Sequence, residues 1–361
     1  MKLSCNAPYG GGGLGRHLAE RIEAARAGGV LEGYYAGEVK PGDEAIAHVV
    51  RPASVHLLQV ATPVRFSRGW SNFLAGELFD RAVAGRLGSP CDSFLGFAGK
   101  ALHSFERALG LGAGHLILAA PNSHVRRVEN RHAAARARRG VESSWMNTAQ
   151  IAKTLREYET ADVIEVNSEY TRESFIEYGV PETKLERTYL TPHPRFQPAA
   201  TRPQDGRFRV VYMGPISTFK GVSELLDAFG RLDDPDAELV LMGGPASRPG
   251  RIHFERRINK DPRVVVAPGD PLPRLQAADV YAHPSWEDGF AYAVAEAMAC
   301  QVPVIVTENT GAMEYVREGV NGYVVGTGNV DQLYERLAFL HERRPRVSPA
   351  GVPDFSGPSV H

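Results

Sequence analysis

The sequence has little cysteine and no long apolar run. Its 361 residues include three cysteines, Cys5, Cys91 and Cys300, which are scattered and lack the close spacing of a metal-binding motif. Such sparse use fits a reducing compartment and argues against structural zinc. No run of about 18 apolar residues occurs, and the N-terminus lacks the apolar core of a signal peptide. We therefore expect a cytoplasmic protein, with peripheral contact to the inner face of a membrane as the open alternative.

The chain also has almost no net charge. Its 41 basic and 42 acidic residues give a formal charge of −1, so no overall field attracts nucleic acid. Hydrophobic residues make up 43% and charged residues 23% of the chain, which is typical of a globular protein in water. The length is sufficient for two domains, each with its own core.

Short apolar runs recur along the second half of the chain. They lie at 207–214, 237–244, 263–268, 279–284 and 302–307, and each ends in Gly, Pro or a polar residue. Buried parallel strands have this composition. Stretches with helical periodicity separate them, at 220–232, 248–260, 290–300 and 311–318. The alternation predicts a doubly wound parallel sheet.

The first half of the chain shows the same alternation of expected strands and helices, but less regularly. A helix is expected from Leu14, with Leu18, Ile22 and Ala25 on one face. Strands are expected at 2–6, 31–36, 54–60, 92–98, 115–121, 162–167 and 185–190. The polar stretch 201–207 has linker composition. We therefore expect domains at 1–203 and 204–343, followed by an irregular Pro/Gly/Ser-rich tail at 344–361.

The stretch 285–299, SWEDGFAYAVAEAMA, combines two acids with a glycine at the expected start of a helix. In an open parallel sheet, ligands bind beyond the carboxyl ends of the strands, where unpaired N–H groups attract anions. Asp288 precedes this helix start and Glu296 lies about two turns along the helix, which separates their backbones by roughly nine to twelve ångströms. The two acids cannot share one metal, but they could hold two ends of an extended ligand. An N-cap aspartate with an unrelated helix glutamate is the alternative.

The longer stretch PSWEDGFAYAVAEAMACQVPVIV resembles the donor-site signature of the retaining glycosyltransferases of family 4. That resemblance implies the GT-B fold, in which two Rossmann-like domains face a cleft. It also implies that Glu296 binds the ribose of a nucleotide sugar and that Asp288 lies near the sugar. The family has Glu at the first acid, so the neighbouring Glu287 is an alternative to Asp288. The implied diphosphate contacts are the backbone amides of Gly289, Phe290 and Ala291.

A further stretch of the second half matches the family pattern. YMGPISTFKGVSELLDAF (212–229) resembles the phosphate-binding loop, which places Gly214 near the donor and Lys220 on its diphosphate. An ammonium group there suits a leaving group that gains negative charge; a solvated lysine is the alternative. Many relatives carry an arginine after the first glycine of this loop, where this chain has Pro215. One phosphate contact is therefore missing or supplied elsewhere.

The N-terminal half carries weaker matches. YGGGGLGRHLAERI (9–22) resembles the glycine-rich loop of the family and places Gly12 and Gly13 near the diphosphate. His124 follows an expected strand and is the histidine that the resemblance places on the donor sugar, with a structural histidine as the alternative. His17 and His103 are weaker candidates for that role. Relatives usually end in further helices that cross back to the first domain, and we expect that crossing to be shortened or absent.

Two charged segments allow a second interpretation. DDPD (233–236) contains an Asp-x-Asp motif but lies beside Pro235, as expected of a solvated turn. The segment 126–139 has six arginines without interleaved aromatics, which indicates a solvated basic helix rather than a nucleic-acid surface. Its alternative is a patch for acidic lipid headgroups or an anionic acceptor.

Together these features predict a retaining, metal-independent glycosyltransferase. Lys220, Asp288 and His124 are its expected catalytic residues, and a nucleotide-diphosphate sugar is its substrate, with no cofactor. UDP, GDP and ADP remain open as the nucleotide, and a glycan, a lipid-linked molecule or a small molecule as the acceptor. An epimerase or phosphorylase of the same fold, or an inactive nucleotide-sugar binding module, are the alternatives.

Overall fold

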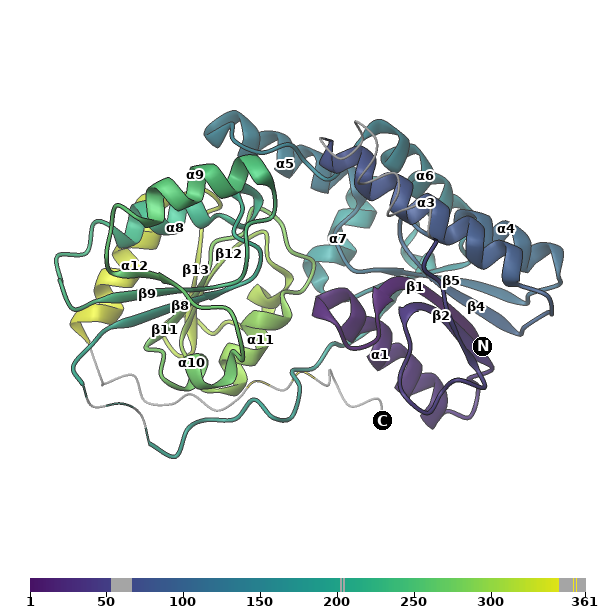
Figure 1. Ribbon diagram of the computed structural model, residues 1–361, viewed down its shortest axis with the longest axis horizontal. Coiled ribbons are helices and arrows are strands. Elements are labelled where there is room, and N and C mark those ends of the chain that lie inside the picture. The colour runs from purple at the N-terminus through teal and green to yellow at the C-terminus, as the bar shows by residue number, and fades with distance from the viewer. Residues whose placement is uncertain (53–66, 202, 204, 344–352, 354, 356–361) are drawn as a thin grey trace. The chain divides into compact units, whose positions relative to one another are not determined.

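The computed structural model describes residues 1–52, 67–201, 203, 205–343, 353 and 355. The chain divides into two compact units. The first comprises Met1–Glu129, Ser143–Asn167 and Thr171–Thr188, and the second comprises Asn130–Glu142, Ser168–Tyr170 and Tyr189–His361. Each unit is built on one parallel sheet with helices on both faces (Figure 1). The expected α/β class is confirmed.

The first unit contains a seven-stranded sheet in the order β3-β2-β1-β4-β5-β6-β7. Its strands are β1 (Lys2–Pro8), β2 (Gly33–Glu38), β3 (Ala47–Val49), β4 (Ser93–Phe97), β5 (His115–Ala120), β6 (Val163–Val166) and β7 (Leu185–Arg187). Six of the seven expected strands match these positions. The seventh, at 54–60, lies outside the described residues, and the three-residue β3 was not predicted.

Helices cover both faces of this sheet. One face packs against α3 (Arg68–Arg86), α4 (Leu102–Gly110) and α6 (Thr148–Thr160), and the other against α1 (Gly12–Ala27). Helix α7 is Glu169–Glu177, and the short η2 turn is Glu182–Lys184. Helix α5 (Val125–Arg139) starts in the first unit, and its residues from Asn130 onward belong to the second.

The second unit contains a six-stranded sheet in the order β10-β9-β8-β11-β12-β13. Its strands are β8 (Arg209–Met213), β9 (Glu238–Met242), β10 (Val264–Val266), β11 (Val280–His283), β12 (Val304–Thr307) and β13 (Gly322–Val325). All five expected strands are present. The sixth, β13, is four residues long and was not predicted.

Helices α8 (Val222–Phe229), α9 (Arg248–Ile258) and α12 (Val330–Glu342) pack on one face of this sheet, and α10 (Leu272–Gln276) and α11 (Tyr292–Ala299) on the other. The helix expected at 311–318 is instead the short 3₁₀ turn η4 (Gly311–Tyr315). Another 3₁₀ turn, η3 (Thr218–Lys220), precedes α8. In the described part of the chain, no helix is long and apolar enough to span a membrane.

The strand order places the candidate site. In the second sheet β8 lies between β9 and β11, so the connections after β8 and after β11 leave adjacent strands toward opposite sides. This reversal of strand order opens a crevice at the carboxyl ends of the two strands, where ligands of doubly wound sheets bind. The loop carrying Lys220 follows β8, and the loop carrying Asp288 follows β11.

Gly221 allows these two loops to meet. Its φ of +68° lies in the left-handed region, and a Cβ at this position would collide with the carbonyl oxygen of Pro284. We expect Gly221→Ala to lower the free energy of unfolding by about 3 kcal/mol, from backbone strain and overpacking together. Urea denaturation would measure this loss. Gly319→Ala is the matched control, because Gly319 has φ +74° and open space around its Cβ position; equal losses in the two variants would refute the close-approach role.

Candidate functional site

Lys220 and Asp288 form an ion pair at the carboxyl ends of β8 and β11. The Lys220 ammonium lies 2.6 Å from Asp288 Oδ2 and donates a second hydrogen bond, 3.1 Å long, to the backbone oxygen of Glu287. About a quarter of the Lys220 side chain and a fifth of the Asp288 side chain are exposed. Both groups therefore remain accessible to a ligand. Of the two neighbouring acids, Asp288 brings its carboxylate to Lys220, whereas Glu287 contributes its carbonyl.

A buried tyrosine–histidine pair supports the Asp288 carboxylate. His283 Nε2 lies 3.1 Å from Asp288 Oδ2, and His283 Nδ1 lies 3.2 Å from the hydroxyl of Tyr281. The Tyr281 hydroxyl also lies 3.3 Å from the carbonyl oxygen of Met213 at the end of β8. Sequence reasoning missed His283, because a histidine inside an apolar strand carries no signal that its ring meets a residue of the next loop.

This surrounding keeps Asp288 ionised. Burial would raise the pKa of the Asp288 carboxyl, but the positive charge of Lys220 and the hydrogen bond from His283 outweigh burial. The pKa of Asp288 therefore lies well below its usual range. An anionic ligand on Lys220 must therefore compete with the Asp288 carboxylate.

The segment from Gly289 to Ala291 leads into α11. Ala291 is the N-cap residue and has φ +66°, a left-handed conformation that is uncommon for a residue other than glycine. Among the described residues, the backbone N–H groups of Phe290 and Ala291 donate no hydrogen bond. The Gly289 carbonyl accepts a hydrogen bond from Ser168 Oγ at 2.6 Å, which fixes the loop. Free donors at a helix start are suited to phosphate oxygens.

Glu296 lies in the second turn of α11 and is 5% exposed. Gly214 follows β8 with φ +141°, and the Tyr212 hydroxyl donates a 2.8 Å hydrogen bond to the carbonyl oxygen of Pro215. The second unit therefore gathers Gly214, Lys220 and the 287–291 loop around the ends of two strands. Ligand contacts of these residues, and of Glu296, stay predictions.

The candidate diphosphate-binding residues of the glycine-rich loop, Gly12 and Gly13, belong to the first unit. Gly12 opens α1 with φ +60°, and neither Gly10 nor Gly12 has any atom within 4 Å of its Cβ position. Gly13 is the second residue of α1. The backbone therefore has open space beside it at Gly10 and Gly12, whereas a Cβ on Gly11 would lie 2.5 Å from Pro8 Cγ. Diphosphate contacts of Gly12 and Gly13 stay predictions.

His124 lies directly before α5 and is packed among aromatic rings. It is 3% exposed, stacks on Tyr178 at a centroid distance of 4.6 Å, and also contacts Tyr158 and Phe175. Burial, with the nearby positive charge of Arg126, lowers the pKa of His124 to about 4. The ring is therefore neutral at pH 7. Its contact with a donor sugar stays a prediction.

His17 is a core residue of α1. It is 1% exposed, packs edge-on against Phe97, and neither of its ring nitrogens has a hydrogen-bond partner among the described residues. Burial, together with the charge of Arg21, lowers the pKa of His17 to about 3. Its surroundings are those of a structural histidine.

This low pKa predicts an acid-sensitive stability. Below pH 6.5 the unfolded chain binds a proton at His17 and the native chain does not, so stability falls as pH drops from about 6.5 toward 3. Between pH 6.5 and 4.5 the loss is on the order of 2 kcal/mol. Urea unfolding at both pH values should show a smaller loss for His17→Leu than for the wild type. His115→Leu, at an exposed position, is the control; the same loss in all three proteins would contradict the assignment.

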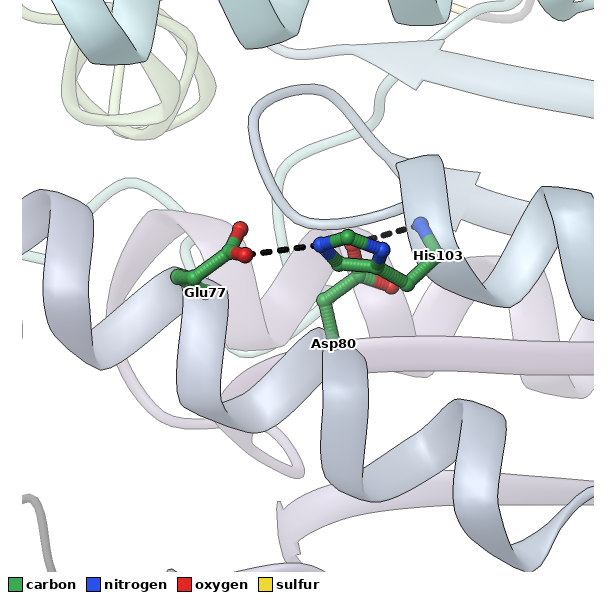
Figure 2. A group of neighbouring side chains, drawn as sticks. All are labelled: Glu77, Asp80 and His103. Atoms are coloured by element: carbon green, nitrogen blue, oxygen red, sulfur yellow. Dashed lines mark hydrogen bonds and ion pairs between the residues drawn. The ribbon is translucent and has the colours of Figure 1, made fainter.

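Glu77, Asp80 and His103 form a cluster with the composition of a metal site (Figure 2). The ligand atoms that they offer lie within 4.8 Å of one another. The Lys153 ammonium already lies 2.8 Å from Glu77 Oε2 and 2.7 Å from Asp80 Oδ2. Asp80 also accepts the backbone N–H groups of His103 and Ser104 and so caps the start of α4. The cluster is thus a partly buried ion-pair network that anchors α4, and a cation would have to displace Lys153.

For the two charged segments, DDPD at 233–236 and the basic segment 126–139, the structure largely agrees with the simpler of the two interpretations, a turn and a helix. Asp234 of the DDPD motif accepts the Asp236 N–H at 2.9 Å and lies 2.7 Å from His341 Nε2, as part of a turn. The basic segment 126–139 forms most of α5. Arg126 and Arg127 pair with acids, as does Arg139. An anionic partner for the other arginines stays a prediction.

Comparison with solved structures defines the class of fold. The chain is similar to sucrose-phosphate synthase of Thermosynechococcus elongatus, with a TM-score of 0.71 and 18% identity over 95% of this chain and 89% of that one. It is also similar to Anabaena HepE, solved in complex with UDP-glucose, with a TM-score of 0.67 and 18% identity over 97% and 92% of the two chains. The chain has the GT-B fold of these proteins, as the sequence predicted.

The sequence comparison adds the family. Residues 207–343 match the family model of glycosyl transferases group 1, which confirms the family resemblance over most of the second unit. The D-inositol 3-phosphate glycosyltransferase of Mycolicibacterium vanbaalenii is 28% identical over 46% of this chain and 43% of its own length. The chain thus spans less than half the length of this curated relative.

Proposed function

We propose that this protein is a retaining glycosyltransferase that takes a sugar from a nucleotide-diphosphate donor without a metal ion. The observation that carries the proposal is the Lys220–Asp288 pair at the carboxyl ends of β8 and β11. It lies where a doubly wound sheet binds ligands and inside the region that matches glycosyl transferases group 1.

The chemistry follows from the charges of the site. Lys220 and the free N–H groups of Phe290 and Ala291 offer positive potential to a diphosphate leaving group, whose negative charge grows as the glycosidic bond breaks. Glu296 holds the ribose hydroxyls. Asp288, kept ionised, faces the sugar and favours a transition state with positive charge on the ring.

Calorimetric titration without added metal, against UDP, GDP, ADP and their common sugar conjugates, tests the proposal. We expect saturable binding of one nucleotide, which then names the donor class. If none of them binds, the donor-site assignment is wrong. Product analysis with the bound donor separates the remaining activities, because an epimerase needs no acceptor and a phosphorylase needs phosphate.

The acceptor is the less constrained half of the reaction. Arg136 and Arg138 near the end of α5 are exposed and have no ion-pair partner among the described residues. Such groups suit an anionic acceptor or acidic lipid headgroups. A glycan, a lipid-linked molecule and a small molecule should therefore each be offered in both neutral and phosphorylated form.

A further inference from the structure

Glu142 makes two short hydrogen bonds inside the second unit, although it precedes the first strand of that unit by more than sixty residues. It is 3% exposed. Its Oε2 accepts the backbone N–H of Thr218 at 2.6 Å, and its Oε1 accepts the hydroxyl of Ser247 at 2.5 Å. Hydrogen bonds to a carboxylate are among the stronger ones in proteins, so this buried acid is a firm anchor.

The first anchored group lies next to the candidate site. Thr218 is the first residue of η3, and Lys220 is the last. Ser217 Oγ accepts the Lys220 N–H, and the Phe219 carbonyl accepts the Trp286 N–H at 3.0 Å, which joins the Lys220 loop to the Asp288 loop. Fixing the Thr218 amide therefore fixes the backbone from which the Lys220 side chain extends.

The rest of the segment 130–142 covers the same loop. The His132 ring lies 4.2 Å from the Phe219 ring, centroid to centroid, and Ala135 packs with Phe219 and Trp286 in a small buried cluster. Further along, Arg139 pairs with Glu224 and Asp227 of α8 at 3.0 and 2.6 Å. The segment thus has one set of contacts with the Lys220 loop and a separate set with α8.

We propose that Glu142 is a positioning residue for Lys220, which holds the η3 turn so that the ammonium group meets the diphosphate of the donor. The proposal rests on the proposed role of Lys220. Glu142 lies outside the region 207–343 that matches glycosyl transferases group 1, and no sequence pattern around it indicates such a role.

Gly250 offers an independent way to move the carboxylate. A Cβ built on Gly250 would lie 2.5 Å from Glu142 Oε1 and 2.9 Å from Ser247 Oγ. Gly250→Ala should therefore push the Glu142 carboxylate away from Ser247 without changing any residue of the Lys220 loop. Because Gly250 lies in the first turn of α9, alanine is also acceptable to the helix.

The experiment compares the affinities of the full-length protein for UDP and uridine, or for the GDP or ADP pair if the wild type selects one of those. We expect Glu142→Ala and Gly250→Ala to weaken diphosphate binding about tenfold and to leave nucleoside binding unchanged, since a shift of about 1 Å in a positioned group is costly. Glu142→Gln, which keeps an acceptor for the Thr218 N–H, should restore most of the affinity. Arg139→Gln is the matched control, because it loosens the same segment only at α8.

The outcomes separate the two proposals. If Lys220→Met weakens diphosphate binding while Glu142→Ala and Gly250→Ala bind as the wild type does, Glu142 has no positioning role and the role of Lys220 stands. If Arg139→Gln weakens diphosphate binding as much as Glu142→Ala does, general docking of the segment replaces Glu142 as the explanation. If Lys220→Met binds diphosphate normally, both proposals fall. Should Glu142→Ala not fold, Gly250→Ala carries the test, because a Cβ there would displace the Glu142 carboxylate.

Discussion

Replacing Lys220 with methionine is expected to weaken binding of the selected nucleoside diphosphate at least tenfold and to slow donor turnover by about 10²–10³-fold. Methionine keeps a side chain of similar length, so the packing of the stem is retained. The variant should remain folded. Calorimetry with UDP, GDP or ADP gives the affinity, and release of the nucleotide from its sugar conjugate gives the turnover.

The physical reason for this loss is the negative charge of Asp288, which Lys220 no longer offsets. In the wild type the Lys220 ammonium compensates the Asp288 carboxylate at 2.6 Å. Without it, no positive side chain offsets the negative charge of Asp288, and like charges on Asp288 and the diphosphate repel. The loss should therefore exceed that of one hydrogen bond, and it should be absent when the matching nucleoside, which carries no phosphate, is the ligand.

Asp288→Asn is the matched variant for this prediction. It removes the competition for Lys220, so diphosphate affinity should stay equal or increase while turnover falls, because the charge facing the sugar is gone. The double variant Lys220→Met/Asp288→Asn should bind the diphosphate better than Lys220→Met alone, as coupled neighbours do. Strictly additive effects would show that the two groups act independently on the ligand.

Replacing Glu296 with alanine is expected to affect the other end of the nucleotide. We expect affinity for the nucleoside and for its diphosphate to fall by the same factor, about a hundredfold, because a carboxylate that accepts two ribose hydroxyls is lost. Turnover at low donor concentration should fall by a similar factor. The side chain is 5% exposed and lies in the second turn of α11.

Ligands that lack ribose hydroxyls test this assignment directly. The wild type should prefer the ribonucleotide over its 2′-deoxy and 3′-deoxy forms, and Glu296→Ala should have lost that preference. Glu296→Gln should keep part of it, since an amide still accepts one hydrogen bond. Unchanged discrimination in Glu296→Ala would place the ribose elsewhere, even if the overall affinity were reduced.

Some features of the candidate site and of the fold could be predicted from the sequence alone. Lys220, Asp288 and Glu296 were predicted from short motifs and from the family resemblance that these motifs carry, since glycines, acids and helix starts are local features that a few neighbouring residues define; their ligand contacts stay predictions. The apolar runs similarly predicted β8 to β12, since a strand buried on both faces needs an unbroken apolar stretch. In the first sheet, strands β1, β2 and β4 to β7 also lie at the positions expected from the sequence.

Other features depend on contacts between distant residues. The four-residue strand β13 exists because it pairs with β12 over Val304–Thr307, and β3 because it pairs with β2. In the same way, the stretch 311–318, which was expected to be a helix, forms only a short 3₁₀ turn. The Gly311 and Ala312 amides of this turn donate hydrogen bonds to the Asp288 and Phe290 carbonyls.

By itself, therefore, the sequence determined the alternation of strands and helices, the GT-B resemblance and the residue types at the ends of β8 and β11, because each depends on neighbours along the chain. Only the tertiary structure decided that Asp288 rather than Glu287 faces Lys220, that His283 and Tyr281 support Asp288, and that Glu142 holds the η3 turn. These contacts join residues up to 76 positions apart. Packing of the sheet and its helices creates them, and no local pattern encodes which side chains will meet.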